Sequence, residues 1–308
     1  MQATADRPRG GVRPADQALR RAIAHTVAYA DVFDYPLERS EIHRYLIGET
    51  APSAEIDAML EHDATLGTCI ERTGDKFHLR GRAGTVEARR GREAASAALW
   101  STARAYGAWI ATLPLVRFVG VTGALAMSNA DPDADIDLFV LTQPGRLWLC
   151  RLLVLGVVRF AAVRGHRLCP NFLLSTEALA LRERNLFTAH EIAQMVPLRA
   201  TDWYPKLLEA NRWAGDHLPN ALASHVGAAR ADGALSRLAT AVLSASLFAP
   251  LERWEMRRKI RRLAARAARE GGSVAFSESE CRGHFAAHDV RVLAAYAERA
   301  ALLEARLG

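Results

Sequence analysis

Residues 116–142 read VRFVGVTGALAMSNADPDADIDLFVLT, and this stretch decides the fold of the chain. Apolar residues from Leu115 to Val121 predict a strand, Gly123 opens a turn and a short helix, and a second apolar strand is expected from Asp135. Side chains two positions apart on a strand point to the same face, so Asp135 and Asp137 should project together. Two carboxylates held that close favour a cation between them, usually a divalent ion with oxygen ligands.

The glycine turn and the carboxylate pair suit one kind of chemistry. Phosphoryl or nucleotidyl transfer needs paired carboxylates to hold Mg²⁺ against a triphosphate. A glycine lets backbone N–H groups and the start of the following helix approach phosphate oxygens. The sequence therefore predicts Asp135 and Asp137 as catalytic residues and metal ligands, and it predicts a nucleotide-binding turn at Thr122, Gly123 and Ala124.

Two simpler interpretations of the acidic stretch DPDADID are less consistent with the sequence. A calcium loop of the EF-hand type that starts at Asp131 would need glycine at position 136 and glutamate at position 142. The chain has Ile136 and Thr142 there, which excludes that loop. A solvated turn would not normally run into an apolar strand, so a metal site is favoured.

Gly123-Ala124 and Asp135-Ile136-Asp137 resemble the glycine-serine turn and the Asp-x-Asp strand of the nucleotidyltransferase superfamily, which has a polymerase-β-like fold. The likeness covers about a fifth of the chain, Leu115 to Ser175. The whole chain resembles a group of bacterial proteins of this superfamily with an N-terminal winged-helix-like unit and a helical C-terminal part. The resemblance implies an α+β fold with a small mixed sheet, Mg²⁺ or Mn²⁺ as cofactor, an NTP (ATP being expected) as co-substrate, and a small molecule, protein or RNA as acceptor.

The chain departs from the pattern of this superfamily at two positions. Ala124 replaces the serine, which removes one hydrogen bond to phosphate and leaves the backbone cradle. The family usually has a third carboxylate on the next strand, as metal ligand and general base, and Asn171 stands there in the expected strand 169–174. An amide oxygen can bind a metal but accepts no proton at neutral pH, so Asp133 or Glu177 would have to substitute. Otherwise the chain is a catalytically inactive nucleotide-binding or regulatory protein.

Two arginines are further candidates for nucleotide binding. Arg146 and Arg151 stand at the start of the helix expected after the Asp-x-Asp strand, where the helix dipole would add to their attraction for a triphosphate. An ordinary solvated role is equally consistent with their positions.

The rest of the chain divides by its periodicity into further units. The expected organisation is a disordered tail 1–16, a winged-helix-like unit 17–84, a nucleotidyltransferase-like unit 85–200 and a helical region 201–308. The winged-helix expectation rests on three short helices followed by a hairpin around Gly74. The third helix is acidic (Glu55, Asp57, Glu61, Asp63), which favours packing or protein contact over nucleic acid binding.

Composition adds weaker expectations. A net charge of +6 permits a phosphate-bearing partner, nucleic acid included. Four dispersed cysteines and a start without an apolar segment favour a cytoplasmic protein. The apolar run 147–163 contains two arginines and is too short to span a bilayer, so a buried helix is expected. Cys281, His284 and His288 have helical spacing but suggest no zinc site. The basic helix 253–270 could bind RNA, a membrane surface or an acidic protein, although a solvated face is the simpler interpretation.

Overall fold

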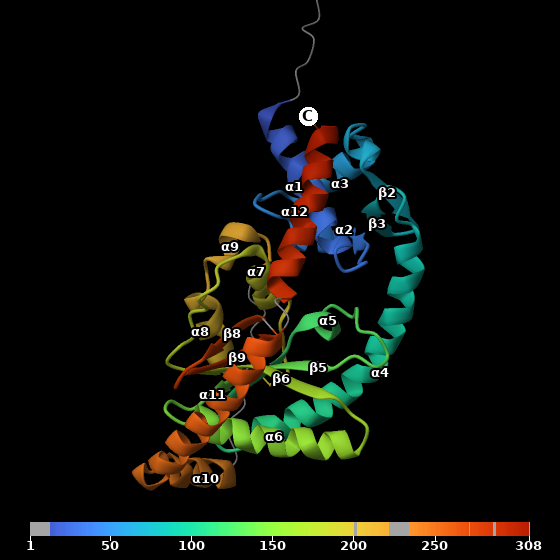
Figure 1. Ribbon diagram of the computed structural model, residues 1–308. Helices are drawn as coiled ribbons and strands as arrows, with labels where there is room; N and C mark the ends of the chain where they lie inside the picture. The colour runs from blue at the N-terminus through green and yellow to red at the C-terminus, as the bar shows by residue number, and fades with distance from the viewer. Residues whose placement is uncertain (1–12, 200–201, 222–233, 271, 286–287, 308) are drawn as a thin grey trace, which may run out of the picture.

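The computed structural model describes residues 13–199, 202–221, 234–270, 272–285 and 288–307. Helices surround two small sheets, one of three strands and one of six, which agrees with the expected α+β class. In Figure 1 the N-terminal unit is at the top, the larger sheet is in the middle and several helices lie beneath that sheet. None of the described helices is long and apolar enough to cross a membrane.

The N-terminal unit combines short helices with a hairpin. Its elements in chain order are α1 (Pro14–Asp31), β1 (Leu37–Glu38), α2 (Arg39–Arg44), α3 (Ser53–His62), the 3-10 helix η1 (Leu66–Thr68), β2 (Ile70–Thr73) and β3 (Lys76–Leu79). The three strands pair in the order β1-β3-β2, and Gly74 turns the hairpin with φ +64°. This order of elements fits the expected winged helix, which stays a prediction. Because α1 begins at Pro14, the last part of the expected tail is helical, and residues 1–12 lie outside the described residues.

The larger sheet is built around residues 116–142. Its first elements are β4 (Val116–Val121), α5 (Gly123–Ala126), β5 (Ile136–Thr142), α6 (Leu147–Val163) and β6 (Leu168–Ser175). Strand β4 runs antiparallel to β5, and β5 runs parallel to β6, with α6 as the crossover. The strand order is β7-β4-β5-β6-β9-β8. Strand β5 begins at Ile136, so Asp135 lies just before the strand.

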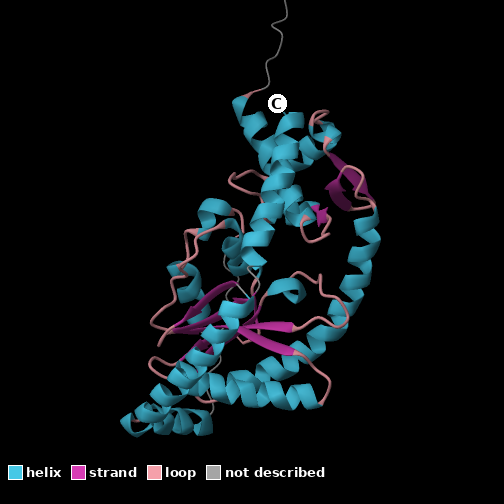
Figure 2. Ribbon diagram, in the orientation of Figure 1, coloured by secondary structure: helices cyan, strands magenta, loops and turns pink. Residues whose placement is uncertain are grey.

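The two faces of the sheet pack against different helices. Ile136, Leu138 and Val140 belong to a buried cluster with α6 and with α4 (Gly84–Thr112), below the sheet in Figure 2. Phe139 and Leu141 point the other way and pack against α7 (Leu186–Gln194). The alternation of a strand therefore directs Asp137 to the α7 face.

The region 201–308 needs correction, because it is not helical throughout. Its elements, with the short strand that precedes them, are β7 (Val196–Pro197), α8 (Trp203–Ala210), α9 (Ala214–His217), α10 (Ala234–Ser244), the 3-10 helix η2 (Ser246–Phe248), α11 (Ala249–Glu270), β8 (Gly272–Phe276), β9 (Glu280–Phe285) and α12 (His288–Leu307). Strand β9 pairs antiparallel with β6, so this region supplies two strands of the larger sheet. Cys281 and His284 lie on β9, so the helical spacing assumed for Cys281, His284 and His288 does not apply.

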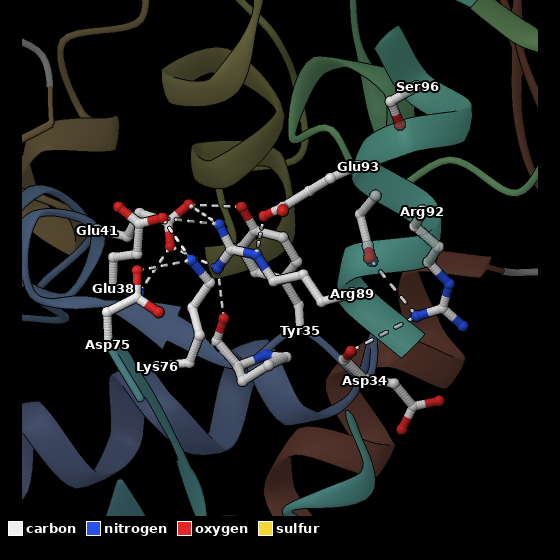
Figure 3. Close-up of polar contacts among 12 residues, drawn as sticks. Asp34, Tyr35, Glu38, Glu41, Asp75, Lys76, Arg89, Arg92, Glu93 and Ser96 are labelled. Carbon is white, nitrogen blue, oxygen red and sulfur yellow. Dashed lines mark hydrogen bonds and ion pairs between the residues drawn. The ribbon is translucent and has the colours of Figure 1, made fainter. Parts of the chain in front are cut away.

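A buried arginine of helix α4 attaches this helix to the N-terminal unit (Figure 3). Arg89 donates to the Glu41 carboxylate at 2.7 and 3.1 Å, to Glu93 at 2.7 Å and to the carbonyl of Pro36, and its guanidinium lies 4.1 Å from the centre of the Tyr35 ring. Further along α4, the buried Ser96 hydroxyl accepts a hydrogen bond from the backbone N–H of Ala130 at 3.0 Å. One helix therefore fixes the N-terminal unit and the loop before β5.

Candidate functional site

Asp137 and Gly123 are in direct contact at the start of β5. Gly123 has φ +66°, a conformation that glycine adopts at little cost. A Cβ at this position would lie 2.6 Å from Oδ2 of Asp137. The backbone N–H of Thr122 also donates to the carbonyl of Asp137 at 3.1 Å. The glycine turn is therefore closed onto the carboxylate, with no space for a side chain between them.

Asn171 on β6 contacts the same carboxylate. Its Nδ2 donates to Oδ1 of Asp137 at 3.0 Å, a contact that the parallel pairing of β5 with β6 makes possible. The Oδ1 atom of Asn171 is buried and has no hydrogen-bond partner. A buried carbonyl oxygen without a partner is unfavourable, and a bound cation or donor would satisfy it.

Glu191 on α7 is a carboxylate that sequence reasoning missed. It lines the same cavity as Asp137 and Asn171. Burial, followed by the nearby charge of Asp137, raises the pKa of Glu191 to about 8. Burial, followed by the charge of Asp135, raises the pKa of Asp137 to about 7. An acidic residue among the apolar residues of α7 was the only available signal for a role of Glu191.

These groups open into a cavity of about 350 Å³ between α1, α5, α7 and the sheet. Its aromatic lining consists of Tyr29, Phe33, Tyr35, Tyr45 and Phe187. The hydroxyl of Tyr29 is buried without a hydrogen-bond partner, and His190 stacks on the Tyr29 ring at a centroid distance of 3.9 Å. The cavity thus combines carboxylates at the sheet with aromatic rings from the N-terminal unit, as a site for an organic ligand would.

Asp135 has different surroundings from Asp137. It is exposed, it does not line the cavity, and its Oδ1 is 2.6 Å from Nε of the exposed Arg167. The two predicted metal ligands are close enough to influence each other electrostatically, but they do not share the strand geometry that the sequence predicted. An exposed ion pair of this kind is weak, so a cation could displace Arg167 from Asp135.

The oxygen atoms around the cavity are of the kinds that bind divalent metal ions. Asp137 and Glu191 supply carboxylates and Asn171 supplies the unpartnered carbonyl oxygen, which are the ligand types that Mg²⁺ and Mn²⁺ prefer. Within the described parts of the chain, no group of three His, Cys, Asp or Glu side chains is arranged to hold a metal ion. A metal at this cavity would therefore depend on Asn171 or on solvent for further ligands.

The residues of the predicted nucleotide-binding turn line two neighbouring cavities next to Asp137. Gly123 and Ala124 line the large cavity. Thr122 is buried and lines a smaller void beside it, of about 30 Å³, together with Asn171 and Glu191. The structure therefore brings together five of the predicted site residues, namely Thr122, Gly123, Ala124, Asp137 and Asn171.

The two predicted arginines lie elsewhere. Arg146 follows the opposite end of β5 and donates to the carbonyl oxygens of Leu243, Ser244 and Ala245 at 2.8–2.9 Å. Arg151 is on α6, on the other side of the sheet, where its charge acts on the buried Cys281 thiol. Their positions on the helix after β5 were correct, but that helix begins at the far end of the strand.

The N-terminus of α6 is not available to a phosphate either. The carboxylate of Glu252 accepts hydrogen bonds from the backbone N–H groups of Trp148 and Leu149, each at 2.8 Å. The dipole of α6 is thus satisfied by a side chain of α11.

The other two suggested carboxylates are also outside the cavity. Asp133 is exposed in the loop before β5, and its backbone carbonyl accepts from Arg167. Glu177 is exposed beyond the last residue of β6, whereas Asn171 lies near the beginning of that strand.

No family model, no curated protein and no solved structure matches this chain.

Proposed function

We propose that this protein is a metal-dependent nucleotidyltransferase that moves a nucleotidyl group from an NTP to an acceptor hydroxyl. The observation that carries the proposal is the contact of the Gly123 turn with the Asp137 carboxylate in the lining of an aromatic cavity. Mg²⁺ or Mn²⁺ would supply charge neutralisation for the triphosphate. ATP remains the expected NTP, and the acceptor is a small molecule, a protein or an RNA.

Each polar residue of the cavity would have its own role in such a reaction. Asp137 would hold the metal ion, with Asp135 joining it when Arg167 is displaced. Asn171 would keep Asp137 oriented through its Nδ2 and present its free Oδ1 to the ion. Glu191 would take the proton of the acceptor hydroxyl, since its raised pKa suits a general base near neutral pH. The acceptor oxygen then bonds to the α-phosphorus, and pyrophosphate leaves.

A second candidate function is a catalytically inactive nucleotide-binding or regulatory protein that contacts nucleic acid or a protein partner. The ion pair between Asp135 and Arg167 favours it, because Asp135 would have to exchange Arg167 for the metal ion before it could act as a ligand. Asn171 at the expected carboxylate position favours it as well.

Label transfer separates the two candidates. Purified protein is incubated with each α-labelled NTP, Mg²⁺ or Mn²⁺ and cell extract. The wild type should transfer label, and Asp137→Asn and Glu191→Gln should each lower the rate about a hundredfold or more. Glu177→Gln changes an exposed carboxylate outside the cavity and should retain the wild-type rate. Binding of NTP without transfer would support the inactive protein, and absence of NTP binding would contradict both candidates.

A further inference from the structure

The segment from α10 to α11 exposes an unusual number of large apolar side chains. Leu238, Val242, Leu247, Leu251 and Trp254 are between 43% and 81% exposed. They occur within one short segment that forms the lower left end of the molecule in Figure 1. Single exposed apolar residues are ordinary, but a concentration of them in one element indicates an interaction surface.

The spacing of these side chains places them on the outer sides of the helices. Leu238 and Val242 are four apart on α10, and Leu251 and Trp254 are three apart on α11, so each pair shares a face. The inner side of α11 carries Met256, Ile260 and Leu263, which pack against the buried cluster beneath the sheet. Exposure of the outer apolar residues is therefore not the result of a loosely attached helix.

The acidic residues of α11 whose side chains the structure describes are turned inward, which leaves the described outer side positive. Glu252 and Glu255 are buried. Glu252 caps α6, and Glu255 accepts from Arg258 at 2.6 and 2.8 Å. The exposed charged residues that remain along this segment are Arg237, Arg253, Arg257, Arg261 and Arg262. The side chains of Arg266, Arg269 and Glu270 lie outside the part of the chain that the structure describes.

Arg146 holds this surface in place. Its guanidinium donates to three consecutive carbonyl oxygens at the end of α10, where that helix turns into η2. Positively charged groups at a helix C-terminus also interact favourably with the helix dipole. The exposed segment around Leu247 is thus fixed to the body of the protein. Binding of a partner to its apolar side chains would therefore not have to order the backbone of this segment first.

We propose that the exposed side of α10, η2 and α11 binds the surface of an anionic lipid bilayer. Aliphatic side chains and a tryptophan would enter the boundary between headgroups and hydrocarbon, while the arginines contact phosphate groups. Four of the five exposed apolar residues are aliphatic. A surface for single-stranded nucleic acid would instead present several aromatic rings for base stacking.

Co-sedimentation of the full chain with vesicles tests this proposal. Vesicles of phosphatidylcholine alone are compared with vesicles that also contain phosphatidylglycerol. The wild type should bind the anionic vesicles and not the neutral ones. The variant Arg257→Glu/Arg261→Glu should bind about 25-fold more weakly or worse, at about fivefold for each arginine that no longer reaches a lipid phosphate. The variant Leu247→Glu/Trp254→Glu should bind about tenfold more weakly or worse, because apolar insertion contributes to binding in addition to charge.

Matched substitutions elsewhere on the surface serve as controls. Val163→Glu changes an equally exposed aliphatic residue at the end of α6, and Arg90→Glu changes an exposed arginine of α4. Both should bind anionic vesicles as the wild type does, and circular dichroism should show all four variants folded. Equal binding to both vesicle types, or equal loss in Val163→Glu, overturns the proposal. Absence of wild-type binding to the anionic vesicles also overturns it, and a single-stranded RNA whose binding Arg257→Glu/Arg261→Glu weakens would then assign the surface to nucleic acid.

Discussion

At position 123 the backbone has φ +66°, and the Asp137 carboxylate occupies the space where a side chain would begin. Two constraints therefore act on this residue, one from its own backbone and one from its neighbour. The left-handed conformation costs any residue with a Cβ about 1 kcal/mol. The contact with Asp137 adds a displacement of the carboxylate itself.

Substitution by alanine separates these constraints. Gly145 has nearly the same backbone, φ +63°, and there is open space where an alanine methyl group would lie. We expect Gly145→Ala to lower the free energy of unfolding by about 1 kcal/mol. Gly123→Ala should cost more and should also weaken binding of Mn²⁺, measured by titration calorimetry. Equal stability and equal metal binding in the two variants would contradict the assigned role of Gly123.

His190 is a buried imidazole in the lining of the cavity, and it makes the stability of the fold depend on pH. Burial lowers the pKa of His190 to about 4, against 6.5 in the unfolded chain. As the pH falls from 6.5 toward 4, the imidazole takes up a proton in the unfolded chain but stays neutral in the folded protein. The free energy of unfolding is therefore highest above pH 6.5 and decreases as the pH falls toward 4. The difference between the two pKa values corresponds to a loss of about 3 kcal/mol in the free energy of unfolding.

A phenylalanine at position 190 should remove that dependence. His190→Phe keeps an aromatic ring to stack on Tyr29 and cannot take up a proton. In urea unfolding at about pH 7 and about pH 4.5, the wild type should lose more stability than the variant does between the two values. The same loss in both proteins would show that His190 does not titrate in this way.

At the scale of elements, α4 is the support that sets the N-terminal unit over the sheet. Arg89 satisfies the half-buried carboxylate of Glu41 and a backbone carbonyl, and Lys76 with Glu38 extends the same polar cluster (Figure 3). Removal of one partner from a buried ion pair leaves the other charge without compensation.

Two neighbouring arginines of α4 test this role. Arg89→Ala should lower the free energy of unfolding by about 3–5 kcal/mol. Arg90→Ala removes an exposed arginine paired with Glu87 and should cost less than about 1 kcal/mol. Chemical denaturation of both variants supplies the comparison, and similar values for the two would argue against a supporting role for Arg89.

At the scale of the whole molecule, the two ends of the described chain pack together. Helix α12 lies along α1 in Figure 1, and its last residues enter the core of the N-terminal unit. Earlier along α12, Val292 belongs to the cluster above the larger sheet. One helix therefore links both cores, and we expect them to unfold together.

Adjacent leucines of α12 provide the test. Leu303 is 4% exposed and Leu302 is 69% exposed. Leu303→Ala should destabilise the protein by about 2–4 kcal/mol in a single transition, followed by fluorescence and circular dichroism. Leu302→Ala should change the stability by less than about 0.5 kcal/mol. Two separate transitions in Leu303→Ala would mean that the cores unfold independently.

Strands β4, β5 and β6, the glycine turn and the buried helix α6 could be predicted from local sequence, because hydrophobic period and turn chemistry act over neighbouring residues. The hairpin β8–β9 was missed. Strand β9 is placed in the sheet by its pairing with β6, a segment distant in sequence, and β8 pairs with β9 in turn. Asp135 lies just before β5, where it is exposed and pairs with Arg167, and the local alternation of the strand could not predict that partner.

The sequence by itself determined that the Gly123 turn follows one strand of the sheet and that Asp137 lies on the next strand along the chain. Only the tertiary structure decided which groups meet there, since it brings Glu191 from α7 and the aromatic rings of the N-terminal unit to the same cavity. The tertiary structure also separates Arg146 and Arg151 from this cavity. Arg146 follows the far end of β5, and Arg151 lies on α6, which covers the opposite face of the sheet. Periodicity fixes the direction of a side chain within its own element, whereas long-range packing fixes its neighbours.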